Sequence, residues 1–284
     1  DDNNEMNYFG ANMCENNKKL VEQTAQKIAN DEIKLDKNVS HNADLTTAFL
    51  KKAYDKNNID FFKKEFKNEN ICEDSYLACW YCKCPVLVSM VNVDIITYLI
   101  HTNPSSKEVV DNIYKIENDV RKGMNLYIDS MDLTDATKQS MKDTLNNVKI
   151  LYYGINIDFD CYFEHINKVE LMENINSDNE AFLSSLSNYL QIFGEVYYYD
   201  KAAPTIFSKE GIYQPNAAAV SKSYYINVFP ALFLSEGYGC SNFSLKYVVC
   251  LVLSHEFGHI WNAYYVEKDM ESDVRASYPI REQD

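Results

Sequence analysis

One apolar stretch near the C-terminus, residues 247–261, constrains this chain more than any other segment. It contains no proline or run of charges, so it predicts a single buried helix over about residues 244–265. His255, Glu256 and His259 lie within it at the spacing H-E-x-x-H. Residues four apart lie one above the other on a helix. We therefore expect both histidines on one face, close enough to bind one metal ion.

These three residue types fit hydrolysis assisted by zinc. Two neutral imidazoles supply two zinc ligands, and a carboxylate one position away can take a proton from a water bound to the ion. The spacing also occurs by chance, and a core helix with two hydrogen-bonded histidines is the alternative interpretation. We predict that His255 and His259 are metal ligands for zinc and that Glu256 is the catalytic general base.

Size and charge limit the classes of partner. The chain has 284 residues, 46% of them hydrophobic, enough for one large domain or two small ones with a real core. Its net charge of −15 argues against nucleic acid or an anionic membrane surface as a partner. Asn92 and Asp94 interrupt the longest apolar run, residues 86–100, which is also too short to span a bilayer. We expect no transmembrane span.

The cysteines and the glycosylation sequons suggest an oxidising compartment. The even count of eight cysteines favours disulfides. Four of them cluster and could instead bind a structural zinc, although the second cysteine pair of such a site is missing: Cys72, Cys79, Cys82 and Cys84. Cys250, inside the apolar stretch, is expected to be a buried free thiol. Sequons at Asn38 and Asn242 point to a secreted or extracellular protein, or to the ectodomain of a membrane-anchored one.

Most of the remaining chain has helical periodicity. Residues 1–16 are polar and rich in asparagine, which suggests a poorly ordered or loosely attached start. The expected helices cover residues 17–35, 45–54, 59–66, 85–100, 105–131, 134–154 and 179–193. Ser105 and Glu108 have the spacing of a capping box for the fifth of these. Residues 223–229 alternate between apolar and polar and are followed by Pro230, as in an edge strand.

The predicted fold is mainly α with a small β element, in which one edge strand lies beside the helix of the zinc motif. Three segments are expected. Residues 1–78 form an N-terminal helical segment, 79–193 a second helical region, and 194–284 the part that carries the H-E-x-x-H helix. The three could equally form one continuous domain.

Several short motifs follow one another in a definite order along the chain. They are Cys84-Pro85 at the start of a helix that ends near Tyr98, Ile116-Glu-Asn-Asp-Val-Arg121, Asp132-Leu-Thr-Asp-Ala-Thr-Lys138, Tyr153-Gly154, Asn216-Ala217, Phe229-Pro230-Ala231, and His255-Glu256-x-x-His259. In this order, over about residues 80 to 265, the chain resembles the neprilysin-like zinc endopeptidases, the M13 peptidase family. No single motif is specific, but the ordered set is.

The resemblance implies an α+β fold of the zincin type, zinc as cofactor, and a peptide or protein substrate. It also implies that Asn216 hydrogen-bonds the substrate backbone and that Ala217 adds backbone contacts. An ordinary loop position is the alternative for Asn216. Two details depart from the family: Ala218 stands where an aromatic residue is usual, and one extra residue separates Asn216 from Phe229.

A larger departure concerns the third zinc ligand. The family takes it from a glutamate in an E-N-x-x-D helix beyond the H-E-x-x-H helix, and a transition-state histidine and a substrate-binding arginine follow. None of these is found here, so the chain is expected to be C-terminally truncated relative to the family. Acidic residues that could substitute, or simply form a solvated tail, are Glu267, Asp269, Glu271, Asp273 and Glu282.

Two functions therefore remain open, besides a helical structural domain with an accidental motif, which the ordered resemblance argues against. The first is a secreted zinc metalloendopeptidase, in which Glu256 transfers a proton from the attacking water to the leaving amine. The second is a catalytically impaired, peptidase-like protein that binds peptides or a protein partner. The missing third ligand favours the second, whereas the intact His255, Glu256 and His259 set favours the first.

Overall fold

The structure is a computed structural model. It describes residues 2–37, 43–55, 85–152, 174–175, 178–185, 187–188, 211–220, 225–234 and 244–267. The chain divides into two compact units. The first comprises residues 1–110, 152–216 and 229–243, and the second comprises residues 111–151, 217–228 and 244–284. The described part is mainly helical with a small three-stranded sheet, which confirms the predicted fold class at that level.

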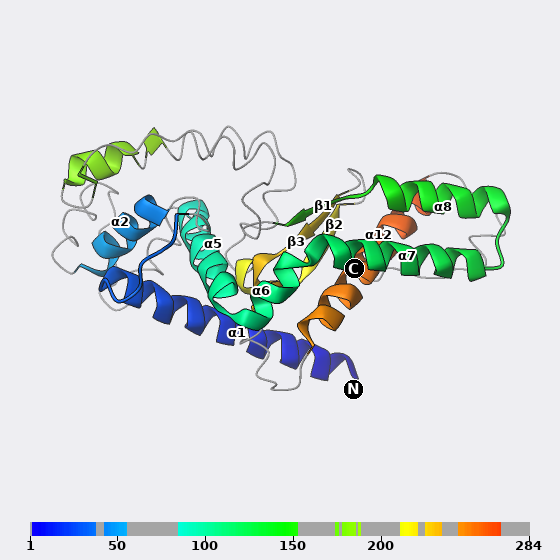
Figure 1. Cartoon of the computed structure of the whole chain (residues 1–284), viewed down its shortest axis with the longest axis horizontal. Helices are drawn as coiled ribbons and strands as arrows, with labels where there is room; N and C mark the ends of the chain where they lie inside the picture. The colour runs from blue at the N-terminus through cyan, green and yellow to red at the C-terminus, as the bar shows by residue number, and fades with distance from the viewer. Residues whose placement is uncertain are drawn as a thin grey trace. The chain divides into compact units, whose positions relative to one another are not determined.

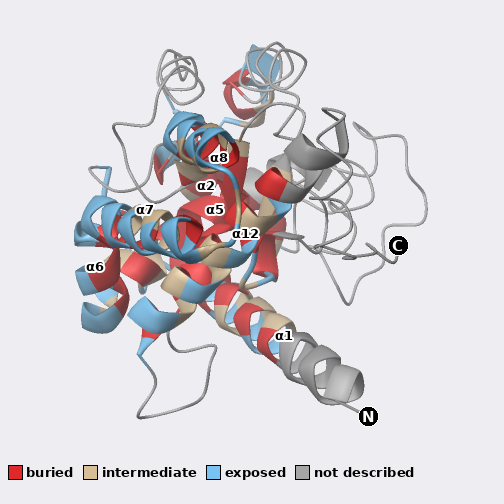
Figure 2. Ribbon diagram, turned by 90° about the vertical axis from the view of Figure 1, so that its right-hand side faces the viewer, coloured by how far each residue is buried: buried red, intermediate tan, exposed pale blue. Residues whose placement is uncertain are grey.

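Three helices form the centre of the first unit. They are α1 (Asp2–Ala29), α2 (Ala43–Tyr54) and α5 (Pro85–Thr102), and α1 packs against both of the others (Figure 1). Its buried stripe recurs at helical spacing through Val21, Ala25 and Ile28. Figure 2 shows α5 buried along much of its length, as its apolar sequence requires. Helix α1 begins at Asp2, inside the polar stretch expected to be poorly ordered or loosely attached, and that expectation stays a prediction.

Two buried polar side chains of α5 form hydrogen bonds inside this unit. The Thr46 hydroxyl donates to the Asp94 carboxylate at 2.6 Å, and the Asn92 amide donates to the Tyr213 hydroxyl at 2.7 Å. Tyr213 belongs to η2 (Gly211–Tyr213), a short 3-10 helix that packs with η4 (Pro230–Phe233) and α5. Asn92 and Asp94, which interrupt the apolar run of α5, therefore each have a hydrogen-bond partner, which reduces the cost of burying them.

The helix predicted over residues 105–131 is two helices, α6 (Pro104–Asp111) and α7 (Ile113–Ser130). Asn112 separates them with φ −107° and ψ 11°, outside the helical region. The N-cap of α6 is Asn103, whose side-chain oxygen accepts from the backbone N–H groups of Ser105 and Ser106 at 3.0 and 3.1 Å. The expected capping box was therefore wrong by two positions, because asparagine caps as well as serine does and Pro104 suits the first helical position.

The second unit contains α7 and α8 (Asp135–Asn147), which lie side by side (Figure 1). The Thr134 hydroxyl caps α8 by accepting from the backbone N–H of Thr137 at 3.3 Å. This start was predicted correctly, but the helix ends at Asn147 instead of residue 154. Strand β1 (Lys149–Tyr152) follows, because the β-branched and aromatic side chains there favour a strand.

The small sheet has the order β1-β3-β2. β2 (Ala217–Val220) pairs antiparallel with β3 (Tyr225–Val228), and Ala219 lies opposite Ile226. The strand predicted over residues 223–229 exists as β3, but it is the central strand, not an edge. Ile226, Asn227 and Val228 are all buried, since neighbours cover β3 on both sides, and Pro230 starts η4 after the strand has ended.

The apolar stretch forms α12 (Leu245–Glu267), one unbroken helix, as predicted. It packs against β2 and α7, and more lightly against α8. Its buried residues include Leu253, Phe257 and Ile260. β2, not β3, is thus the strand beside the motif helix. No described helix is both long and apolar enough to cross a bilayer.

Several predictions fall outside the described residues. These include the helix over 59–66, the end of the helix over 179–193, and both sequons. Residues 179–185 are helical. All cysteines other than Cys14 and Cys250 also lie outside. Cys250 has a free thiol, as expected, although it is half-buried rather than fully buried, and burial raises the pKa of that thiol.

Candidate metal centre

The two histidines of α12 lie next to each other. The Nε2 atoms of His255 and His259 are 2.8 Å apart, and their ring centroids are 4.5 Å apart with the planes nearly perpendicular, at 88°. The i, i+4 spacing on a continuous helix produces this placement. The prediction that both imidazoles occupy the same face is confirmed, and the exposed contact leaves them accessible to a ligand.

The lowered pKa of His255 favours metal binding. Partial burial lowers the pKa of His255, and the charge of His259 lowers it further. A metal ion binds only the neutral imidazole, so a lowered pKa keeps this ligand available to a lower pH.

Glu256 lies one position from His255 but is only 4% exposed. Its Oε2 accepts a hydrogen bond of 2.7 Å from the backbone N–H of Ala219 in β2. Burial raises the pKa of this carboxyl, while the Ala219 N–H and the charge of His259 partly oppose the rise. A carboxylate whose pKa lies above its ordinary value is a better proton acceptor near neutral pH. The hydrogen bond uses Oε2 and leaves Oε1 as the oxygen that can accept the proton.

The three side chains can hold a metal ion. One ligand atom from each of His255, Glu256 and His259 lies within 4.8 Å of the others. Tetrahedral zinc with bonds of about 2.05 Å would separate two nitrogen ligands by about 3.3 Å. The nitrogens at 2.8 Å therefore need to part by only a few tenths of an ångström, well within rotation about the imidazole side-chain bonds. The donor set fits the ion.

If Glu256 acts as the general base and not as a ligand, no other His, Cys, Asp or Glu among the described residues joins the cluster as a third protein ligand. Glu267 is the last residue of α12, and its side chain is not described. The other acidic candidates, Asp269, Glu271, Asp273 and Glu282, lie beyond the described part of the chain. Their role as substitutes stays a prediction.

The two predicted substrate-binding residues flank the start of β2. Asn216 is exposed and immediately precedes the strand, and its carbonyl accepts from the backbone N–H of Phe229 at 3.0 Å. Ala217 is buried and lies opposite Val228 in the register. Both residues thus lead into the strand that contacts α12. Their contacts with a substrate backbone stay a prediction.

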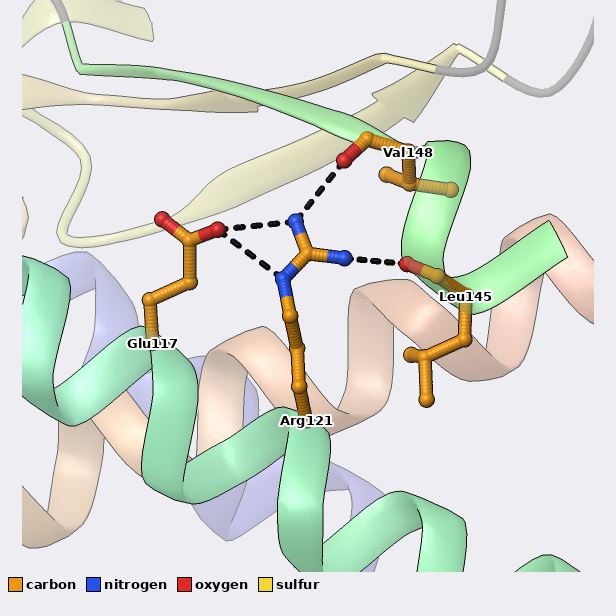
Figure 3. A network of polar contacts seen from close by, with 4 residues as sticks. All are labelled: Glu117, Arg121, Leu145 and Val148. Carbon is orange, nitrogen blue, oxygen red and sulfur yellow. Dashed lines mark hydrogen bonds and ion pairs between the residues drawn. The ribbon is translucent and has the colours of Figure 1, made fainter. Parts of the chain in front are cut away.

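The sequence placed Arg121 in one of the ordered motifs but assigned it no role, and in the structure it contacts the motif helix on the side away from the histidines. Its guanidinium lies with its centre 5.0 Å from the ring centroid of Phe257, the residue after Glu256. Nε and Nη2 both donate to Glu117, at 2.9 and 2.8 Å (Figure 3). Nη2 also donates to the carbonyl of Val148 at 2.7 Å, and Nη1 donates to that of Leu145. From the sequence, only the Glu117–Arg121 ion pair could have been predicted, because these residues have the i, i+4 spacing.

Comparison of the chain with protein-family models, with curated proteins and with solved structures finds no match.

Proposed function

We propose that this protein is a zinc-dependent metalloendopeptidase of the neprilysin-like type, with a zincin-like second unit. The observation that carries the proposal is the placement of Glu256 beside two imidazoles whose Nε2 atoms are 2.8 Å apart. The ordered motifs of the sequence support it. The even count of cysteines and the sequons support a secreted or extracellular location, and the resemblance supports a peptide or protein substrate.

In this proposal His255 and His259 hold the zinc ion. When bound, zinc polarises the scissile carbonyl and lowers the pKa of a water ligand. Glu256 accepts a proton on Oε1 and returns it to the leaving amine. Ala219 keeps the carboxylate in place through its N–H. Asn216 and Ala217 would hold the substrate backbone beside β2.

Metal binding by two imidazoles is expected to be weaker than in a complete site. Catalytic zinc sites usually have three protein ligands and one water, and two neutral nitrogens provide no negative charge to offset the dication. Water in place of the third ligand would let the ion move relative to Glu256. Since general base catalysis requires the carboxylate within about 3 Å of the proton it takes, we expect slow hydrolysis.

The alternative is a catalytically impaired protein that binds peptides or a protein partner. The observation that favours it is that, among the described residues, no His, Cys, Asp or Glu other than Glu256 lies with the two imidazoles as a third ligand. This alternative protein keeps the same metal site and the same strand beside α12. It differs from the peptidase only in the rate at which it cleaves peptides. Cleavage assays therefore separate the two functions, whereas zinc content does not.

The test combines metal analysis with peptide cleavage. Wild-type protein, Glu256→Gln and His255→Gln are dialysed against buffered zinc, and the zinc content and the cleavage of a mixed peptide library are measured. His101→Gln, which alters a half-buried histidine in the last turn of α5, is the matched control. We expect zinc in wild type, Glu256→Gln and the control, and loss of zinc in His255→Gln. Among the three forms that bind zinc, only Glu256→Gln should lose peptide cleavage.

Two outcomes would change the conclusion. Wild-type protein without zinc would overturn the metal site. Zinc binding that His255→Gln lowers, with no cleavage by wild type, would favour the peptide-binding alternative.

A further inference from the structure

The network around Arg121 joins three elements of the second unit. Arg121 and Glu117 belong to α7, and the accepting carbonyls of Leu145 and Val148 lie at the C-terminal end of α8. Phe257, which lies under the guanidinium face, belongs to α12. Four of the five guanidinium N–H groups are therefore used, and the planar face is covered as well.

The chemistry of this network requires arginine. The last carbonyls of a helix have no partner within the helix, and a cation at that end is favoured by the helix dipole. The Arg121 and Glu117 side chains are only 16% and 17% exposed, so solvent screens their interaction much less than that of a surface pair. A lysine would keep the charge but could not donate to Glu117 and to two separate carbonyls at once.

Phe257 connects this network to the helix that carries the two histidines. Each helical residue advances the chain by about 100°, so Phe257 lies about 200° around α12 from both His255 and His259. The ring is fully buried, at 0% exposed, whereas the imidazoles on the other side are accessible. The ring therefore anchors the back of the helix that carries the imidazoles on its front.

We propose that Arg121 is a positioning residue for the metal site, which fixes the rotation of α12 through its contact with Phe257. This inference rests on the proposed role of His255 and His259 as metal ligands. A rotation of α12 by about 10° would move an atom at the surface of the helix by about 1 Å. Functional sites tolerate displacements of only about 0.5 Å. Arg121 is therefore required for the ligand geometry without touching the ion.

A matched control separates this role from general stability. Lys142 of α8 forms an ion pair of 2.5 Å with Asp129 of α7, so it joins the same two helices. The pair is more exposed, and no contact of Lys142 with α12 is found among the described residues. Arg121→Met and Lys142→Met both remove a cation that ties α7 to α8. Only the first removes the contact with Phe257.

The first measurement uses Co(II) as the probe metal. Its affinity and its visible d–d absorption are measured for wild type, Arg121→Met, Arg121→Lys, Phe257→Leu and Lys142→Met, at a temperature where circular dichroism shows each to be folded. We expect Arg121→Met to weaken Co(II) binding by about ten- to a hundredfold and to change the spectrum, the usual effect of losing a group that orients a ligand. Lys142→Met should stay within about twofold of wild type.

Two further variants test the route through Phe257. Arg121→Lys should resemble Arg121→Met, because it lacks the fork of donors. The double variant Arg121→Met with Phe257→Leu should be no weaker in Co(II) binding than the worse single variant, because both changes remove one contact. Equal losses in Arg121→Met and Lys142→Met, or additive losses in the double variant, would overturn the proposal.

The second measurement does not depend on any metal. Long-range ¹H–¹⁵N spectra of the metal-free protein report the imidazole nitrogens of His255 and His259. We expect these resonances to shift in Arg121→Met and to stay in place in Lys142→Met. Wild type that binds no Co(II) would contradict the proposed function, and these spectra would still decide the role of Arg121. Unchanged imidazole resonances in Arg121→Met would overturn it.

Discussion

The backbone N–H of Ala219 holds the carboxylate of Glu256 at 2.7 Å. This bond links the edge strand of the small sheet to the motif helix. Because Ala219 lies in β2, which has β3 on one side only, its N–H is available for a side chain instead of a second strand. The proposed general base on α12 is thus oriented by a backbone N–H of a neighbouring strand. Because this donor belongs to the backbone, no side-chain rotation of Ala219 can move it away.

The buried position of Glu256 predicts a dependence of stability on pH. Its folded-state pKa is raised by burial above the ordinary value of 4.5. Ionisation therefore costs stability, and the cost appears as pH rises from about 4.5 through the folded pKa. We expect metal-free Glu256→Gln to be more stable than wild type at pH 7, with the difference lost below the unfolded pKa.

Urea unfolding at pH 4 and pH 7 checks this expectation. The control is Glu180→Gln, which alters an exposed glutamate. Glutamine keeps an oxygen that can accept from Ala219, so the comparison isolates the charge. A Glu256→Gln protein that is less stable than wild type at pH 7 would contradict the prediction.

The cap of α6 predicts a local difference between two neighbouring substitutions. Asn103 accepts from two backbone N–H groups, and the Ser105 side chain is not the cap. Asn103→Ala should lower the free energy of unfolding by about 1 kcal/mol, the usual cost of losing an N-cap. Ser105→Ala should change it by less than about 0.5 kcal/mol. The reverse order in thermal or urea unfolding would restore the capping box expected from sequence.

This cap also shows where sequence reasoning succeeds and fails. The motif helix and the His255–His259 pair were predictable, because a period of 3.6 residues and an i, i+4 spacing are local properties. The position of β3 at the centre of the sheet was not, because strand order depends on partners far apart in the chain. The contact of Arg121 with Phe257 joins residues on two different helices, so no local pattern reports it. The choice between Asn103 and Ser105 failed for a smaller reason, since both residue types cap helices.

Gly258 predicts a stabilising substitution inside the motif. A Cβ built on it meets nothing within 4 Å, and the same holds for Gly123 in α7. Glycine in a helix interior costs about 0.5–1 kcal/mol relative to alanine. Gly258→Ala and Gly123→Ala should each raise the free energy of unfolding by about that amount, with Co(II) affinity unchanged. Destabilisation by Gly258→Ala alone would show that the position beside His259 needs to be open for a reason other than helix stability.

Chelation provides the last prediction, since a ligand that binds only the folded state stabilises it by mass action. Zinc at about a hundred times its dissociation constant should add about 2.7 kcal/mol to the free energy of unfolding. EDTA should reverse this gain in wild type and change nothing in His255→Gln. Because protons compete for the imidazoles, the gain should also shrink as pH falls, and the lowered pKa of His255, caused mainly by burial, keeps this ligand neutral to a lower pH. Thermal unfolding at pH 7.5 and pH 5.5, with and without zinc, measures both effects. A zinc-dependent gain that persists in His255→Gln would place the ion elsewhere in the chain, with the cysteine cluster at residues 72–84 as the next site to test.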